Sequence, residues 1–398
     1  MDDEARATGL DRVSERRPKG HRRGWRSAYR HPHHDDSQGS GAAGRNTSGP
    51  TYAALDLGTN NCRLLVARAT RDSFRVIDSF SRIIRLGEGV TASGRLSEAA
   101  IARAIEALRV CRVKMRNRGV TRARLIATEA CRFADNGGEF IERVRRETGL
   151  RLEVISRETE AQLAVAGCAA LLDPGCTTAL VFDIGGGSSE LMLVEIRPVE
   201  RSEAACGRAL SHRILAWTSL PVGVVTLAER YGGIEIDRTL FERMIVDVAG
   251  HLAPFRCDPV VAAASVEPAS MHFLGTSGTV TTIAGIHMRL RRYDRSRVDG
   301  CWLDSADATR ICEQVLAMGY EGRIRSPCIG RERADLVLAG CAILQAIIRA
   351  WKCARIRVAD RGLREGILSQ LMSEDGYLAP PRDAVPPEPA AAWPNNAG

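Results

Sequence analysis

The sequence is poor in aromatic residues and lacks any long apolar segment. Aromatic side chains make up 5% of the 398 residues and do not alternate with the clustered arginines. Proteins that bind single-stranded nucleic acid stack bases on aromatic side chains, so specific nucleic-acid binding is not predicted. No uncharged apolar run reaches the length of about 18 residues that a membrane-spanning helix needs. The sequence therefore predicts no membrane span.

Cysteine is present, but not in the patterns of metal or redox sites. The 12 cysteines include no C-x-x-C pair and no Cys/His spacing suited to zinc. We interpret them as reduced thiols in the interior. The first residues are polar and charged, which does not fit a secretory signal. Together these features predict a cytoplasmic protein.

The charge balance favours polyanionic partners. Lys and Arg number 56 against 48 Asp and Glu, and the formal net charge is +8. Such a surplus suits nucleic acid, anionic lipid or a phosphate-rich substrate. Arginines cluster within residues 109–124 and 289–297. Each cluster fits either a solvated helix face or a track for polyphosphate.

Both ends of the chain have the composition of flexible tails. Residues 1–50 contain hardly any aliphatic side chains and cannot bury enough apolar surface to offset the entropy of ordering. We interpret the histidines within this basic tail as solvated rather than as metal ligands. Residues 379–398 are rich in Pro and Ala, and we expect a flexible tail from about residue 373.

Between the tails, a pattern of strands and helices occurs twice. Residues 52–57 and 62–67 predict a β-hairpin, and residues 178–184 and 190–194 predict another. The turn sequences LDLGTN and FDIGGG share the order apolar, Asp, apolar, Gly. This duplication predicts two similar α/β domains that face each other, at residues 51–165 and 166–372. Further expected elements are a strand at 74–79, a helix capped by Ser97, a strand at 125–128, a helix at 139–148, a strand at 152–155 and a helix at 159–170.

The two predicted turns have the residues of phosphate-binding loops. Each places an Asp at the end of a strand, followed by Gly residues that let backbone N–H groups approach an anion. A single Asp-Gly turn often only reverses the chain, but two at the starts of repeated domains are far more specific. A third Gly-rich element, residues 273–279, leads into a helix expected from near Val280. It fits either an anion site at a helix N-terminus or an ordinary capped turn.

These motifs resemble those of the exopolyphosphatase / guanosine pentaphosphate phosphohydrolase (Ppx/GppA) family, and the resemblance runs from about Tyr52 to Leu371. Further stretches agree with it. They are LGEG at 86–89, GRLS at 94–97, VIS at 154–156, SLPVG at 219–223, RAD at 333–335 and DRGLREG at 360–366. The resemblance implies two ribonuclease H-like domains of the actin/sugar-kinase/Hsp70 superfamily with a cleft between them.

The resemblance also implies roles for individual residues. It assigns Glu160 as the general base and Arg132 as a phosphate-contacting residue. It assigns Asp183 and Glu190 to magnesium, the expected cofactor. The implied substrate- and phosphate-binding residues are Asp56, Gly58, Thr59, Asn60, Gly185, Gly186, Gly187, Ser188, Gly275, Thr276, Ser277 and Gly278.

Each acid also has a simpler interpretation, and the sequence departs from the family pattern in places. Glu160 stands in the first turn of a predicted helix, where Glu is common because of the helix dipole. Glu129 stands where relatives usually carry a small or neutral residue, and it places an anion near Arg132. Asn61 replaces a small residue after the first turn. The chain resembles the short form of the family, without its C-terminal HD-like domain.

The function that best fits these features is exopolyphosphatase activity. Phosphoryl transfer needs charge neutralisation, in-line geometry and an oriented water, which a metal, loop amides, Arg and one carboxylate can supply. Hydrolysis of guanosine pentaphosphate uses the same parts and stays open. A related kinase or a non-catalytic alarmone sensor is a weaker alternative. The expected partners are the polyphosphate or guanosine polyphosphate substrate and a second copy of the chain in a homodimer.

Overall fold

The computed structural model describes residues 49–70, 73–199, 209–265 and 270–378. Residues 1–48 of the expected N-terminal tail and residues 379–398 of the expected C-terminal tail lie outside these ranges. None of the helices in the described part of the chain has the length and apolar character needed to cross a bilayer.

The first sheet has the strand order β3-β2-β1-β4-β5. Strand β1 runs antiparallel to β2 and parallel to β4. Its members are β1 (Thr51–Leu57), β2 (Asn61–Ala69), β3 (Phe74–Ile83), β4 (Arg122–Ala127) and β5 (Glu153–Val154). The first expected hairpin is therefore confirmed as β1 and β2. The strand expected at 74–79 extends further, to Ile83.

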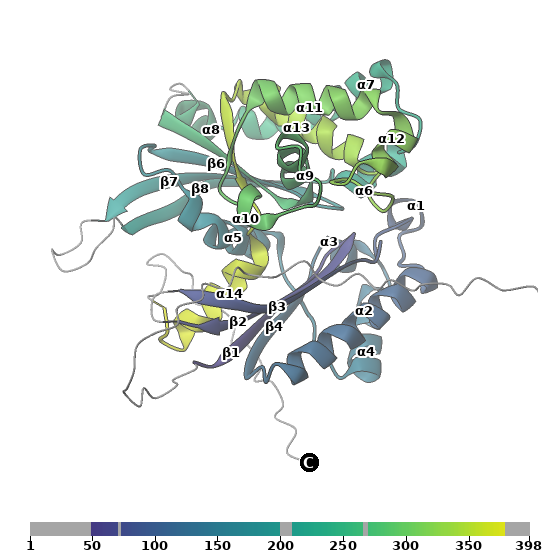
Figure 1. Ribbon diagram of the computed structural model, residues 1–398, viewed down its shortest axis with the longest axis vertical. Coiled ribbons are helices and arrows are strands. Elements are labelled where there is room, and N and C mark those ends of the chain that lie inside the picture. Colours follow the sequence, from purple (N-terminus) through teal and green to yellow (C-terminus); the bar gives the residue numbers. More distant parts are fainter. Residues whose placement is uncertain (1–48, 71–72, 200–208, 266–269, 379–398) are drawn as a thin grey trace, which may run out of the picture.

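Helices α2 (Glu98–Asn117) and α4 (Gly137–Thr148) cover one face of this sheet, and their apolar sides form a core with it. The expected cap at Ser97 is confirmed, because its side chain accepts a hydrogen bond from the N–H of Ala100. Short helices α1 (Val90–Ser93) and α3 (Glu129–Phe133) follow β3 and β4. Helix α3 brings Glu129 and Arg132 to the end of the sheet that faces the second domain (Figure 1).

The second sheet has the order β10-β11-β9-β6-β7-β8. Its strands are β6 (Thr178–Ile184), β7 (Ser189–Val199), β8 (Ala209–Leu220), β9 (Met271–Thr276), β10 (Trp302–Asp304) and β11 (Arg355–Ala359). The helices after β8 are α6 (Val224–Tyr231), α7 (Arg238–Arg256), α8 (Pro259–Ala264), α9 (Ser277–His287), α10 (Arg295–Val298), α11 (Ser305–Ala317), α12 (Gly319–Arg325) and α13 (Val337–Trp351). Helix α13 is buried along almost its whole length within the core of this domain.

The two sheets repeat one topology. In each, three consecutive antiparallel strands (β1 to β3 and β6 to β8) are followed by strands that run parallel to the first of them (β4 and β9). This repeat confirms the two ribonuclease H-like domains of the actin/sugar-kinase/Hsp70 architecture. The β1–β2 hairpin of the first sheet and the β6–β7 hairpin of the second turn at equivalent ends of their sheets. Their two turns can therefore meet between the domains.

Two helices that pack against each other, α5 and α14, connect the two domains. Helix α5 (Arg157–Cys168) packs on α14 (Leu363–Glu374), and α14 packs on β1 of the first sheet (Figure 1). A Cβ added at Gly366 would lie 2.0 Å from the Leu163 carbonyl oxygen, so this close approach of the two helices requires glycine. The division expected from the sequence leaves α14 in the second domain, whereas its apolar residues Ile367, Leu368, Leu371 and Met372 complete the core on the other face of the first sheet.

Candidate active site

The turns of the two hairpins lie in direct contact across the domain boundary. The first turn, Gly58–Asn60, follows β1, and the second, Gly185–Ser188, follows β6. A Cβ added at Gly186 would lie 3.0 Å from Thr59 Cβ and 3.1 Å from the Asn60 backbone nitrogen, and one at Gly187 would lie 2.8 Å from Thr59 Oγ1. Glycine is therefore required here for close approach of two domains.

Each turn is closed by one hydrogen bond of its own. The Gly58 N–H donates to the Asn61 carbonyl at 2.9 Å, and the Gly185 N–H donates to that of Ser188 at 3.0 Å. Within the described residues, no acceptor is bonded to the N–H groups of Thr59, Asn60, Gly186 or Gly187. Successive free N–H groups in a tight turn are suited to binding an anion.

The second turn is held in place by α6. The N–H groups of Val224 and Val225 donate to the carbonyls of Gly185 and Gly186 at 2.9 and 2.8 Å. A Cβ at Gly223 would lie 2.4 Å from the Gly186 carbonyl carbon, so only glycine fits. The SLPVG motif at residues 219–223 therefore ends at the glycine that packs against the second turn.

Two carboxylates face each other on the second hairpin. Asp183 and Glu190 are direct cross-strand partners, so their side chains share one face of the sheet. Glu190 is 4% exposed and accepts hydrogen bonds from Ser188 Oγ at 2.6 Å and Ser219 Oγ at 3.0 Å. Burial, with repulsion from Asp183, raises the pKa of Glu190 to about 7. Burial raises the pKa of Asp183 to about 6, and Arg63 opposes this rise.

Glu160 and Arg132 form an ion pair on the opposite side of the boundary. Arg132 Nη2 donates to Glu160 Oε2 at 2.8 Å, and Arg132 Nη1 donates to the Ile155 carbonyl at 2.8 Å. Glu160 lies in the first turn of α5, where Ser156 caps the helix by accepting the Thr159 N–H. Burial raises the pKa of Glu160 well above its usual range; the charge of Glu190 adds to the rise and Arg132 opposes it. The structure thus brings together the residues assigned to catalysis.

Glu129 lies within this same arrangement. Its Oε2 accepts from Arg132 Nη2 at 2.8 Å, and its Oε1 accepts from Arg157 Nη2 at 2.5 Å. Burial acts to raise the pKa of Glu129, but the hydrogen bonds from Arg157 and Arg132 outweigh it and lower the pKa. Glu129 is therefore an ionised partner of Arg132. The sequence indicated its proximity to Arg132 but not its contact with Arg157.

The third Gly-rich element separates into two parts. Gly275 lies within β9 against Phe182, and an added Cβ would lie 2.6 Å from that ring. Thr276 Oγ1 donates to the Arg361 carbonyl at 2.7 Å. These two residues, assigned to phosphate binding from the sequence, make internal contacts instead. Helix α9 begins at Ser277 rather than near Val280, and Ser277 itself has a φ of 82°, a left-handed conformation that is uncommon for a residue other than glycine.

Two arginines lie beside Gly278: Arg333, which belongs to the RAD motif at 333–335 but was given no role from the sequence, and Arg63, which was not singled out. A Cβ added at Gly278 would be 3.8 Å from Arg63 Nη2 and 4.0 Å from Arg333 Nη1. Within the described residues, neither arginine is within ion-pair distance of a carboxylate. Burial and the neighbouring charge of Arg63 lower the pKa of Arg333. Two cations beside a helix N-terminus are a combination that could bind an anion. Arg63 could have been noticed as a charged residue near the start of β2, shortly after the first Gly-containing turn.

Asp56 occupies the first hairpin at the position of Asp183 in the second. It is half-buried, and burial raises its pKa, while Arg63 and Arg364 oppose the rise. Arg63 is its direct cross-strand partner. Asp56 therefore lies at the end of β1 next to a cation.

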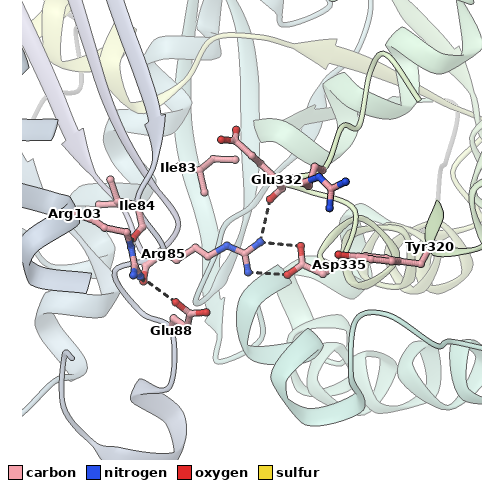
Figure 2. Close-up of a pocket in the computed structure, with 9 residues that line it drawn as sticks. Ile83, Ile84, Arg85, Glu88, Arg103, Tyr320, Glu332 and Asp335 are labelled. Carbon is pink, nitrogen blue, oxygen red and sulfur yellow. Dashed lines mark hydrogen bonds and ion pairs between the residues drawn. The ribbon is translucent and has the colours of Figure 1, made fainter. Parts of the chain in front are cut away.

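The domains make a second contact, beside a pocket of about 540 Å³. Arg85, in the loop after β3, donates to both carboxylate oxygens of Asp335 at 2.7 and 2.9 Å and to the Glu332 carbonyl at 3.2 Å (Figure 2). The Gly89 N–H donates to Glu229 Oε1 of α6 at 2.7 Å. These bonds fix how the domains meet on this side.

The acids of the cleft form pairs and not a closed metal cage. Among the described residues, no group of three or more His, Cys, Asp or Glu side chains is placed to hold a metal ion. Asp183 and Glu190 supply two adjacent carboxylates with raised pKa values. Magnesium typically binds through one or two carboxylates, with water and substrate phosphates as its other ligands. The pair therefore fits a magnesium ion that is shared with a substrate.

The chain is similar in sequence to two proteins whose names describe phosphoanhydride hydrolysis. The chain is 27% identical over 332 residues to "Exopolyphosphatase 2" of Mycobacterium tuberculosis, covering 80% of this chain and 98% of the relative. It is 27% identical over 326 residues to "Guanosine-5'-triphosphate,3'-diphosphate pyrophosphatase" of Aeromonas salmonicida, covering 82% of this chain and 60% of that protein.

Solved structures show the same fold. A crystal structure of the Aquifex aeolicus member of the Ppx/GppA protein family has 29% identity and a TM-score of 0.65, covering 82% of this chain and 99% of that one. An exopolyphosphatase structure from Cytophaga hutchinsonii has a TM-score of 0.70 at 22% identity, with 81% and 98% covered. The model of the Ppx/GppA phosphatase family matches residues 65–375, and the chain belongs to this family.

Proposed function

We propose that this protein is an exopolyphosphatase, which hydrolyses the terminal phosphoanhydride bond of inorganic polyphosphate and releases orthophosphate. The observation that carries the proposal is the meeting, at one domain boundary, of two turns with free N–H groups, a carboxylate pair and a general-base candidate held by an arginine. The relative named as an exopolyphosphatase supports it.

A second candidate is the 5′-phosphohydrolysis of guanosine pentaphosphate. The relative from Aeromonas salmonicida carries that type of name. Both reactions cleave a terminal phosphoanhydride, so the same side chains serve either one. A direct comparison of the two substrates decides between them.

Glu160 is the proposed general base. Arg132 donates to Glu160 Oε2, which fixes the carboxylate and leaves Oε1 to accept a proton from the attacking water. A base works best when its pKa is near the operating pH, and burial moves the pKa of Glu160 in that direction. The phosphate to be transferred then lies between this water and the two turns.

The remaining groups of the cleft bind and neutralise the substrate. In this proposal, the free N–H groups of the two turns bind the terminal phosphate, because successive free N–H groups in a turn suit an anion. Arg63 and Arg333, beside the start of α9, bind the phosphates next to it. Asp183 and Glu190 would hold magnesium, which when bound supplies positive charge to the transferring phosphoryl group.

The test is phosphate release by the full chain from long polyphosphate, guanosine pentaphosphate and ATP with magnesium. Glu160→Gln should fold normally and lose about 100- to 10,000-fold in rate, because an amide cannot accept the proton. Glu158→Gln, an exposed neighbour on the same helical turn, is the matched control and should keep its rate. A rate for Glu160→Gln within a few-fold of the wild type would show that the base is misassigned.

A further inference from the structure

Glu129 is an acid held by two arginines inside the cleft. It starts α3 directly after β4 and is 9% exposed. Arg132 donates to its Oε2 through Nε at 3.2 Å and Nη2 at 2.8 Å. Arg157 donates to Oε2 through Nε at 3.1 Å and to Oε1 through Nη2 at 2.5 Å. Each of these four hydrogen bonds to the carboxylate therefore comes from one of two guanidinium groups.

The position of this acid is next to the groups that the reaction uses. A Cβ added at Gly187 of the second turn would lie 3.2 Å from Glu129 Cγ. The same Nη2 of Arg132 contacts both Glu129 and Glu160. Glu129 thus lies between the phosphate-binding turns and the general base, where a substrate phosphate would meet Arg132.

Around Glu129, the ion-paired side chains comprise equal numbers of arginines and carboxylates. Two cations, Arg132 and Arg157, are paired with two anions, Glu129 and Glu160. Arginine binds carboxylate and phosphate with the same forked geometry, so Glu129 occupies the donors that a phosphate would use. Arg63 and Arg333 have no such carboxylate among the described residues.

We propose that Glu129 is a built-in counter-anion that competes with substrate phosphate for the Arg132 and Arg157 pair, an inference that rests on the proposed function. It lowers the affinity for short phosphates and favours chains long enough to reach Arg63 and Arg333 as well. The single orthophosphate product cannot make both sets of contacts, so the competition also assists its release.

The test measures binding rather than turnover, with inorganic tripolyphosphate as the probe, by calorimetry in metal-free buffer. Glu129→Gln should bind the probe about tenfold more tightly than the wild type, because one anion has left the site. Its affinity should also fall more steeply with added salt. Glu129→Asp keeps the charge and should stay nearer to the wild type. Glu242→Gln removes an equal charge from the ion pair between Glu242 of α7 and Arg349 of α13, and should change nothing.

A double variant checks that charge balance is the cause. Glu129→Gln combined with Arg157→Gln restores the net charge and should return the affinity toward that of the wild type. If Glu129→Gln unfolds early, Arg157→Gln alone tests the same balance, and it should weaken binding of the probe by a similar factor.

Equal or weaker binding of tripolyphosphate by folded Glu129→Gln would overturn the proposal, because Glu129 would then only orient the arginines. Unchanged binding by Arg157→Gln would overturn it as well. Failure of the proposed function would appear separately, as absence of phosphate release by the wild type from every substrate tested.

Discussion

The two hairpins that meet in the cleft share a backbone plan but differ in charge. In the first, Asp56 has Arg63 as its cross-strand partner. In the second, Asp183 has Glu190 at the equivalent place. The first hairpin therefore carries its own counter-charge, whereas the second gathers negative charge that burial makes costly. A repeated fold does not repeat its chemistry, and the second hairpin is where a cation is needed.

The strongest way to break this comparison is Asp183→Asn. Loss of one of two adjacent carboxylates should lower the maximal rate about 100-fold and raise the magnesium concentration needed for half-maximal activity. Phosphate release measured across a magnesium titration checks both. Asp173→Asn, in a turn where Asp173 accepts only the Gly175 N–H, is the control and should do little. Unchanged magnesium dependence in Asp183→Asn would reduce the second hairpin to a structural turn.

Arg63→Gln removes the counter-charge of the first hairpin. We expect KM for tripolyphosphate to rise about tenfold with a smaller change in kcat, because a charged hydrogen bond to a bound phosphate is lost. Steady-state kinetics at fixed magnesium measures the two constants. Arg75→Gln, exposed on β3, removes an equal charge outside the cleft and serves as the control. A fall in kcat with KM unchanged would contradict the binding role.

The charge of the second hairpin should appear in the pH dependence of stability. Burial and mutual repulsion raise the pKa of Glu190 from 4.5 to about 7, and burial raises that of Asp183 from 3.8 to about 6. Folding thus favours the protonated acids, and this stability is fully present below the unfolded pKa values, is lost as the pH rises from 3.8–4.5 toward the folded values of about 6 and 7, and is gone above them. Magnesium favours the ionised acids, so it should raise Tm more at pH 8 than at pH 5. Thermal melts with and without magnesium test this.

Glu190→Gln tests whether this pair of acids causes the pH dependence. It removes one of the two titrating acids, so the difference between the magnesium-induced rise in Tm at pH 8 and at pH 5 should become smaller. An identical gain in Tm at both pH values in the wild type would mean that magnesium does not act through this pair.

The smallest effect is expected at the second contact between the domains. Arg85 and Asp335 are partly exposed, and such ion pairs contribute little free energy. Arg85→Gln should raise KM about threefold or less and leave kcat unchanged, because the approach of the two turns becomes slightly less favoured. A loss of activity as large as that expected for Asp183→Asn would show that the Arg85–Asp335 ion pair, rather than the contact between the two turns, determines how the domains are positioned.

Local rules account for the parts of the molecule that sequence reasoning predicted. Both hairpins, the Ser97 cap and the helix at 139–148 follow from periodicity and capping within a few neighbouring residues. The Asp and Gly residues of the two turns follow from the repeat. Residue pattern was less reliable at element ends, where α5 begins at Arg157 and β5 is reduced to Glu153–Val154.

The sequence by itself determined the duplicated domains, the paired turns and the acids that the turns carry. Only the tertiary structure placed α14 on the first sheet, because an apolar helix face does not specify which sheet it covers. It also decided that Gly275 packs against Phe182, that Arg63 meets Arg333, and that Glu129 neutralises Arg157. These outcomes depend on charges and surfaces from segments distant in the chain, and residue spacing does not encode which of them become neighbours.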